Sequence, residues 1–176
     1  GVYMKKGVYM KIRQERIEDH NKIRALVKAA FDSAEHADGN EQNLVTALRR
    51  SKNYIPQLAL VAEENGEIVG HIMFSKATVG DNEVLALAPL SVLPDYQRKG
   101  IGTALIKEGH KIARQLGYEY VVVLGSEIYY PKVGYVPADM LGIVPPFDVP
   151  RENFMAYQLD EFAQKIHGVI HYAKEF

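Results

Sequence analysis

The chain has 176 residues, 47% of them hydrophobic, and its 21 basic and 22 acidic side chains give a formal net charge of −1. This balance provides no strongly basic surface, so we expect no nucleic-acid partner. The absence of cysteine excludes disulfides, thiolate zinc sites and a cysteine nucleophile, and it agrees with a cytoplasmic location.

The N-terminal segment repeats the sequence GVYMK at residues 1–5 and 7–11, and it has no hydrophobic signal core. We expect residues 1–9 to originate from cloning or to be disordered. The rest of the chain shows no further repeat, linker or low-complexity segment. Residues 10–176 are therefore predicted to form a single domain.

Hydrophobic spacing predicts two helices after a first strand at residues 9–19. The first helix spans residues 19–31, with Asp19 as its N-cap, and the second spans residues 41–51. The apolar positions expected to point inward are Ile23, Leu26, Val27 and Ala30 in the first helix and Leu44, Val45 and Leu48 in the second.

The clearest hairpin lies at residues 57–79, where two β-rich runs flank Asn65 and Gly66. That pair is typical of a type I′ turn, because both central residues of this turn need positive φ. Another strand follows at residues 81–94 and carries Pro89 in its middle. Proline donates no backbone hydrogen bond, so we expect this strand to be distorted or only half paired near Pro89.

The second half of the chain alternates between helices and strands. A helix is predicted at residues 99–116, with Gly117 suited to its C-cap, and a strand buried on both faces at residues 118–125. The inward stripe of this helix is predicted to be Ile101, Leu105, Ile112 and Leu116. The remaining elements are a helical turn and strand within residues 126–139, and strands at residues 153–160 and 167–173 around a short helix at 160–166.

The longest largely apolar run is far shorter than the roughly 20 residues of a membrane-spanning helix, so no membrane partner is expected.

Two glycines, Gly100 and Gly102, stand directly behind Arg98 and Lys99 at the start of the predicted third helix. A helix N-terminus offers unpaired amides and the positive end of a dipole, and glycine lets an anion approach the backbone. The pattern therefore favours anion binding over a simple tight turn. The dinucleotide fingerprint needs a small residue where Leu105 stands, and no Walker loop occurs.

Residues 97–102, QRKGIG, match the Q/R-x-x-G-x-G/A signature of the GNAT superfamily of acyl-CoA-dependent N-acetyltransferases. Residues 128–138 resemble its F-Y-x-K-x-G-F segment, and residues 154–176 resemble the tail of the bacterial YhbS-like branch of predicted acetyltransferases. The resemblance implies an α/β fold with a mixed, mostly antiparallel central sheet. That sheet would be splayed at the cofactor strand and flanked by helices.

The resemblance also implies acetyl-CoA as cosubstrate, without a metal. The backbone of one strand would pair with the pantetheine arm, and the amides of the loop that follows would hold the pyrophosphate. The matching strand positions are Leu90, Ser91 and Val92, and the loop positions are Gln97, Arg98, Lys99, Gly100, Ile101, Gly102 and Thr103.

Tyr130 aligns with the family tyrosine that lies near the sulfur of the coenzyme, where a phenol can give the leaving thiolate a proton. Its neighbour Tyr129 is the alternative. Many family members place a glutamate on the strand before the loop, but residues 86–92, ALAPLSV, contain no carboxylate. A water relay is therefore expected instead, with Glu127, His71 or Glu35 as candidates for its outer end.

The resemblance predicts an enzyme that transfers the acetyl group to a primary amine of a small molecule or peptide, by direct attack in a ternary complex. The alternative is an acyl-CoA-binding sensor with little catalysis. A homodimer is the assembly often found among similar proteins.

The loop between the first two helices either attracts a cationic amine or is an ordinary solvated loop; its acidic residues are Asp32, Glu35, Asp38 and Glu41. His167 and His171 lack a third ligand, so no metal is expected.

Overall fold

The computed structural model describes residues 2–5, 8–32, 34 and 37–176. Its helices are α1 (His20–Asp32), α2 (Glu41–Arg49) and α3 (Ile101–Gln115). Its strands are β1 (Val2–Lys5), β2 (Val8–Gln14), β3 (Tyr54–Glu64), β4 (Glu67–Val79), β5 (Asn82–Val92), β6 (Tyr120–Leu124), β7 (Val136–Pro137), β8 (Ile143–Val144), β9 (Phe154–Gln158) and β10 (Gly168–His171).

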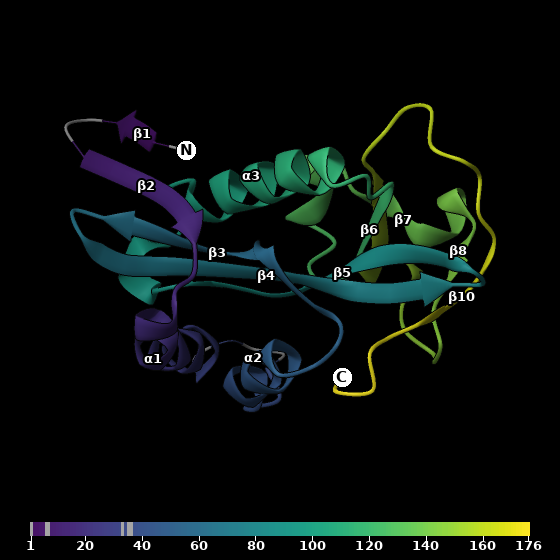
Figure 1. The fold of residues 1–176 in the computed structure, drawn as a ribbon. Helices are drawn as coiled ribbons and strands as arrows, with labels where there is room; N and C mark the ends of the chain where they lie inside the picture. The colour runs from purple at the N-terminus through teal and green to yellow at the C-terminus, as the bar shows by residue number, and fades with distance from the viewer. Residues whose placement is uncertain (1, 6–7, 33, 35–36) are drawn as a thin grey trace.

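The strands form an open mixed sheet in the order β1-β2-β3-β4-β5-β6-β9-β7, and β10 pairs with both β4 and β8. Adjacent strands are antiparallel except β5–β6 and β8–β10. Helix α3 covers one face of the sheet, whereas α1 and α2 lie against the other (Figure 1). The expected architecture, a mostly antiparallel mixed sheet flanked by helices, is therefore confirmed.

The hairpin between β3 and β4 turns at the predicted pair. Asn65 has a φ of 51° and Gly66 a φ of 84°, and Glu64 pairs with Glu67 across the turn. Both central residues thus adopt the positive φ that a type I′ turn requires. The local sequence was sufficient to predict this connection.

Strand β5 is distorted at Pro89, as predicted. Its register against β4 shifts between Leu87 and Leu90, and the Ala88–Pro89 peptide bond is cis. Before the shift, β5 pairs with β6 at Leu85 and Ala86. After the shift, residues 90–92 pair with β4 and not with β6, so β5 and β6 separate and the sheet is splayed at this point.

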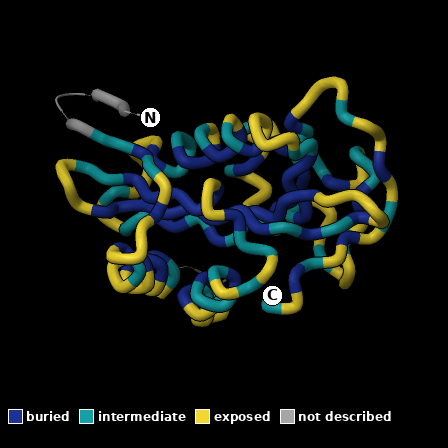
Figure 2. Tube along the Cα trace, viewed as in Figure 1, coloured by how far each residue is buried: buried dark blue, intermediate teal, exposed yellow. Residues whose placement is uncertain are grey.

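Buried residues are concentrated in the sheet and on the inner sides of the helices (Figure 2). On α3 the predicted stripe is partly wrong, because Ile112 is only half-buried and Leu116 is 43% exposed. Besides Ile101 and Leu105, the buried residues of α3 are Ile106, Gly109, His110 and Ala113. The reason is close packing on β4, since a Cβ at Gly109 would overlap the ring of Phe74.

The N-terminal part of the chain departs from the predictions at two points. The first strand ends at Gln14, and a 3₁₀ turn (Ile17–Asp19) leads into α1. Asp19 does not cap α1, because its carboxylate accepts hydrogen bonds from the Arg13 guanidinium at 2.7 Å and from the backbone N–H of Arg16 at 2.8 Å. The Arg13 charge is the stronger partner for this carboxylate.

The predicted helix at residues 160–166 is absent from the structure. The backbone of Gln164 is bound from outside, since its N–H donates to a Glu119 carboxylate oxygen at 3.0 Å and its carbonyl accepts from the Tyr120 hydroxyl at 2.9 Å. The ring of Phe162 is 85% exposed. These long-range hydrogen bonds hold the segment in an irregular path against β6.

Candidate active site

The glycine loop between β5 and α3 forms one wall of a cavity of about 460 Å³. Gly100 precedes α3 with a φ of 87°, and Arg98 has a φ of 62°. The first amides of a helix have no partner within it, so the N–H groups at the start of α3 are available at this cavity. The residues that line the cavity are Leu90, Val92, Tyr96, Gln97, Arg98, Gly100, Ile101, Gly102, Thr103 and Tyr129.

Most of the predicted cofactor residues thus meet at one cavity, with Ser91 and Lys99 as the exceptions. Side chains alternate along β5, so Leu90 and Val92 face the cavity while Ser91 is buried on the opposite side of the strand. The side chain of Lys99 lies over the ring of Tyr96, with Nζ 5.4 Å from the ring centroid. Gln97 joins the loop to the end of β5 by donating from Nε2 to the Val92 carbonyl at 3.0 Å.

The two adjacent tyrosines have different environments. Tyr129 lines the cavity, and its hydroxyl lies 3.0 Å from the Thr103 hydroxyl. Tyr130 is 9% exposed and its ring packs edge-on against those of Tyr129 and Tyr135. Burial raises the pKa of Tyr130 above its ordinary value, so its phenol stays protonated and can act as a proton donor.

A buried polar cluster lies beneath the other face of β5 and includes a residue that sequence reasoning missed. The side chain of Glu15 is 1% exposed and accepts hydrogen bonds from Arg49 of α2 at 2.7 Å and from the Tyr54 hydroxyl at 2.8 Å. Nε2 of His71, on β4, lies 2.9 Å from the other carboxylate oxygen. Glu15 is a single carboxylate between a strand and a turn, and no sequence pattern marks it.

Glu127, another candidate for the proton relay, makes no hydrogen bond to this cluster. The carboxylate of Glu127 is exposed and accepts a hydrogen bond from Asn153 at 2.8 Å. Glu35 lies outside the described residues. In the acidic loop, Asp32 pairs with Lys28 at 2.8 Å on the surface, and Glu41 accepts a hydrogen bond from the backbone of Asp38.

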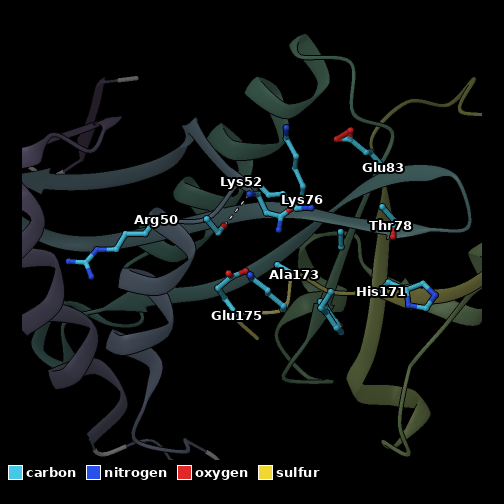
Figure 3. Close-up of a pocket in the computed structure, with 13 residues that line it drawn as sticks. Arg50, Lys52, Lys76, Thr78, Glu83, His171, Ala173 and Glu175 are labelled. Atoms are coloured by element: carbon cyan, nitrogen blue, oxygen red, sulfur yellow. Dashed lines mark hydrogen bonds between the residues drawn. The ribbon is translucent and has the colours of Figure 1, made fainter.

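A larger cavity, of about 760 Å³, lies at the edge of β4 (Figure 3). It occupies the gap between the end of the β3 pairing at Ser75 and the start of the β10 pairing at Thr78. Its charged lining residues are Arg50, Lys52, Lys76, Glu83, Lys174 and Glu175, and Arg50 points away from the rest of them in Figure 3. It shares no lining residue with the glycine-loop cavity.

Within the described residues, no group of three or more histidine, aspartate or glutamate side chains is arranged to hold a metal ion. His167 and His171 are both exposed. Among the same residues, no helix has the length and apolar character needed to cross a membrane.

The sequence matches the family model described as Acetyltransferase (GNAT) family over residues 21–135. It is 37% identical over 140 residues to the uncharacterized N-acetyltransferase YjhQ of Escherichia coli (strain K12), covering 77% of this chain and 75% of YjhQ. It is 28% identical over 171 residues to the uncharacterized N-acetyltransferase YhbS of the same strain, covering 95% and 98% of the two chains.

Two solved structures resemble the fold over nearly the whole chain. A GNAT family acetyltransferase from Brucella melitensis, in complex with acetyl-CoA, has a TM-score of 0.78 at 34% identity and covers 94% of this chain and 97% of its own. The structure of YhbS from Escherichia coli, in complex with CoA, has a TM-score of 0.87 at 26% identity and covers 98% and 94%.

Proposed function

The chain belongs to the GNAT family of acetyltransferases, and we propose that it transfers the acetyl group of acetyl-CoA to a primary amine by direct attack in a ternary complex. The observation that carries the proposal is the glycine-loop cavity, which joins the splayed half of β5 to the N-terminus of α3. A helix N-terminus stabilises phosphate groups, and an unpaired strand edge can pair with the amides of an extended ligand.

The residues of this cavity fit the two ends of the coenzyme. The loop amides from Gln97 to Thr103 would hold the pyrophosphate, and the backbone of residues 90–92 would pair with the pantetheine arm. The bound thioester supplies an activated acetyl group. Without cysteine in the chain, no thiol is present to carry the acetyl group between two half-reactions, which supports direct attack by the amine.

Tyr130 is proposed to give a proton to the sulfur as it departs. Its raised pKa keeps the phenol protonated at neutral pH, and its position beside Tyr129 brings it next to the cavity. Replacing Tyr130 by phenylalanine should lower kcat about 100-fold and leave the Kd for acetyl-CoA within twofold, because the ring remains in place. The matched variant Tyr129→Phe should change acetyl-CoA binding more than kcat; the reverse pattern would assign the proton donor to Tyr129.

A pair of glycines tests the coenzyme site itself. Gly100 and Gly66 have φ values of 87° and 84°, and a Cβ on either would meet no heavy atom within 4 Å. An alanine therefore imposes the same backbone strain of about 1–2 kcal/mol at both positions. Only Gly100→Ala should weaken acetyl-CoA binding in calorimetry, by tenfold or more, since only that methyl group would meet the pyrophosphate.

The alternative function, an acyl-CoA sensor, is favoured by the lack of a carboxylate on residues 86–92. Thiol release with a panel of amines separates the two functions. The panel should contain an alkyl polyamine, an aminoglycoside, amino acids and a peptide with a free N-terminus. Tight binding of acetyl-CoA without amine-dependent thiol release would identify a sensor, and no binding by the folded protein would remove both functions.

A further inference from the structure

We propose that His71, oriented by Glu15, receives the proton lost by the acceptor amine, through the hydroxyl group of Ser91. This inference rests on the acetyl transfer proposed above. It assigns a general base to that reaction, because residues 86–92 contain no carboxylate that could serve as one. The three residues come from the turn after β2, from β4 and from β5. None of them lines the glycine-loop cavity.

The carboxylate of Glu15 is held in its charged form. Burial opposes its ionisation, but hydrogen bonds from His71 and Arg49, together with the charges of these residues, outweigh burial and bring the pKa of Glu15 well below its ordinary value. Arg49 donates from Nε at 2.7 Å to one carboxylate oxygen and from Nη2 at 3.1 Å to the other. The negative charge next to His71 is therefore maintained at neutral pH.

This carboxylate selects the tautomer of His71. Nε2 lies 2.9 Å from a carboxylate oxygen of Glu15, which can only accept, so Nε2 carries the hydrogen. In the neutral ring, Nδ1 then carries the free lone pair. Nδ1 has no hydrogen-bond partner among the described residues although it is fully buried. A proton arriving at Nδ1 would form an imidazolium that the Glu15 carboxylate stabilises.

Ser91 is the polar neighbour on the cofactor strand. His71 and Ser91 are paired positions of β4 and β5, and antiparallel partners have side chains on the same face of the sheet. The Ser91 hydroxyl is also buried without a partner among the described residues. Ser91 lies in the half of β5 that has separated from β6, between Leu90 and Val92, which line the glycine-loop cavity.

A purely structural role explains only part of this cluster. The ion pair between Glu15 and Arg49 fastens α2 to the sheet, and the Tyr54 hydroxyl adds a further hydrogen bond. That role would be complete without a histidine at position 71 or a serine at position 91. Burying two unpaired polar groups side by side costs free energy, and such costs are concentrated at functional sites.

The acceptor amine loses a proton before it attacks the thioester. An alkylammonium acceptor gives one proton to the Ser91 oxygen, while the Ser91 hydroxyl proton passes to Nδ1 of His71 through one bridging water, because these two groups are not hydrogen-bonded to each other. The neutral nitrogen then attacks the thioester carbonyl, the N–C bond forms and the C–S bond breaks. The departing sulfur takes a proton from the Tyr130 hydroxyl. The second proton of the nitrogen then passes to the Tyr130 oxygen and restores the phenol. The products are an amide, a thiol and one proton, which His71 releases to solvent.

Charged and titratable groups surround the pair of Glu15 and His71 in the described part of the chain. They are Arg49 from α2, Tyr54 from β3 and His20 from α1, whose Nε2 lies 3.8 Å from a Glu15 oxygen. The side chain of His20 is one-third exposed, whereas that of His71 is fully buried. His20 therefore provides a matched control for substitutions of His71.

The test compares His71→Gln with His20→Gln on two acceptors. With an alkylamine at pH 7, His71→Gln should lower kcat at least 100-fold and leave the calorimetric Kd for acetyl-CoA unchanged. The loss should shrink as the pH approaches 10, where the amine deprotonates without help. With an arylamine, which is already neutral at pH 7, the variant should approach the wild-type rate. His20→Gln should match the wild type throughout. Equal losses on both acceptors at every pH would overturn the relay.

Two further measurements test the proton relay if His71→Gln does not fold. Ser91→Ala is a small change and should lose activity toward the alkylamine but not toward the arylamine. The ¹⁵N shifts of His71 should show a protonated Nε2 and a bare Nδ1, whether or not an acceptor is known. An Nδ1–H tautomer contradicts the inference even if acetylation is observed. A wild-type protein that binds acetyl-CoA but acetylates no amine contradicts the proposed function instead.

Discussion

Two histidines are buried on opposite faces of the central sheet, and their surroundings differ. His71 is fully buried beside the carboxylate of Glu15, on the side of α2. His110 belongs to α3 and is 5% exposed. Its Nε2 lies 2.8 Å from the Tyr135 hydroxyl, and its ring stacks on Tyr157 with centroids 4.2 Å apart.

The difference shows that burial alone does not determine what a histidine can do. Burial, together with the charge of Arg114, lowers the pKa of His110 to about 4, so this ring remains neutral and serves as a flat packing element. His71 has an ionised carboxylate next to Nε2, and its Nδ1 has no hydrogen-bond partner in the part of the chain that the structure describes. An anionic neighbour can stabilise a protonated ring, and aromatic neighbours with a weakly polar hydroxyl cannot do so to the same extent.

The largest expected effect on stability follows from removing the charge of the Glu15 carboxylate. Glu15→Gln would leave the mostly buried charge of Arg49 without its partner, so we expect unfolding free energy to fall by about 3–5 kcal/mol. Urea denaturation at pH 7 measures this change. Asp139→Asn is the matched control, because the pair of Asp139 with Arg151 is exposed and its loss should change the midpoint little. A small effect of Glu15→Gln would mean that the cluster is not a stable ion pair.

The next largest expected effect is the dependence of the unfolding free energy on pH, which comes from His110. Unfolded histidine binds a proton below pH ~6.5, whereas the folded ring resists protonation until about pH 4. The unfolded state therefore gains protons first, and the stability contribution present above pH 6.5 is lost as the pH falls. We expect a loss of roughly 2–3 kcal/mol between pH 7 and pH 4.5. Denaturation of His110→Gln at both pH values should show a correspondingly smaller loss.

The smallest effects come from the two tyrosine hydroxyls. Tyr54 donates to the charged Glu15 at 2.8 Å, and Tyr135 pairs with the neutral His110 at the same distance. Tyr54→Phe should cost about 2 kcal/mol and Tyr135→Phe about 1 kcal/mol, because hydrogen bonds to charged groups are stronger. Thermal or urea unfolding of both variants provides the comparison. Equal costs would show that Glu15 is not ionised in the folded protein.

Much of the fold could be predicted because its signals are local. The Asn65-Gly66 turn, the distortion of β5 at Pro89 and the glycine loop before α3 each depend on the backbone preferences of adjacent residues. Those preferences act over two or three positions and are visible in the sequence. The same loop, with its family signature, was enough to predict most residues of the cavity.

The predictions that were wrong depended on partners far along the chain. Residues 160–166 have helical spacing, but Glu119 and Tyr120 bind the backbone of Gln164 and hold it outside a helix. The inward face of α3 is rotated because Gly109 must pass close to Phe74. In both cases a tertiary contact outweighed a weak local preference.

The sequence by itself determined where the chain turns, where β5 is distorted and where a glycine loop precedes α3, because these properties belong to neighbouring residues. Only the tertiary structure brought Glu15 to His71, which are 56 positions apart, and placed Ser91 on the face opposite the glycine-loop cavity. A contact between distant residues depends on the register and packing of whole strands, so no short stretch of sequence can specify it.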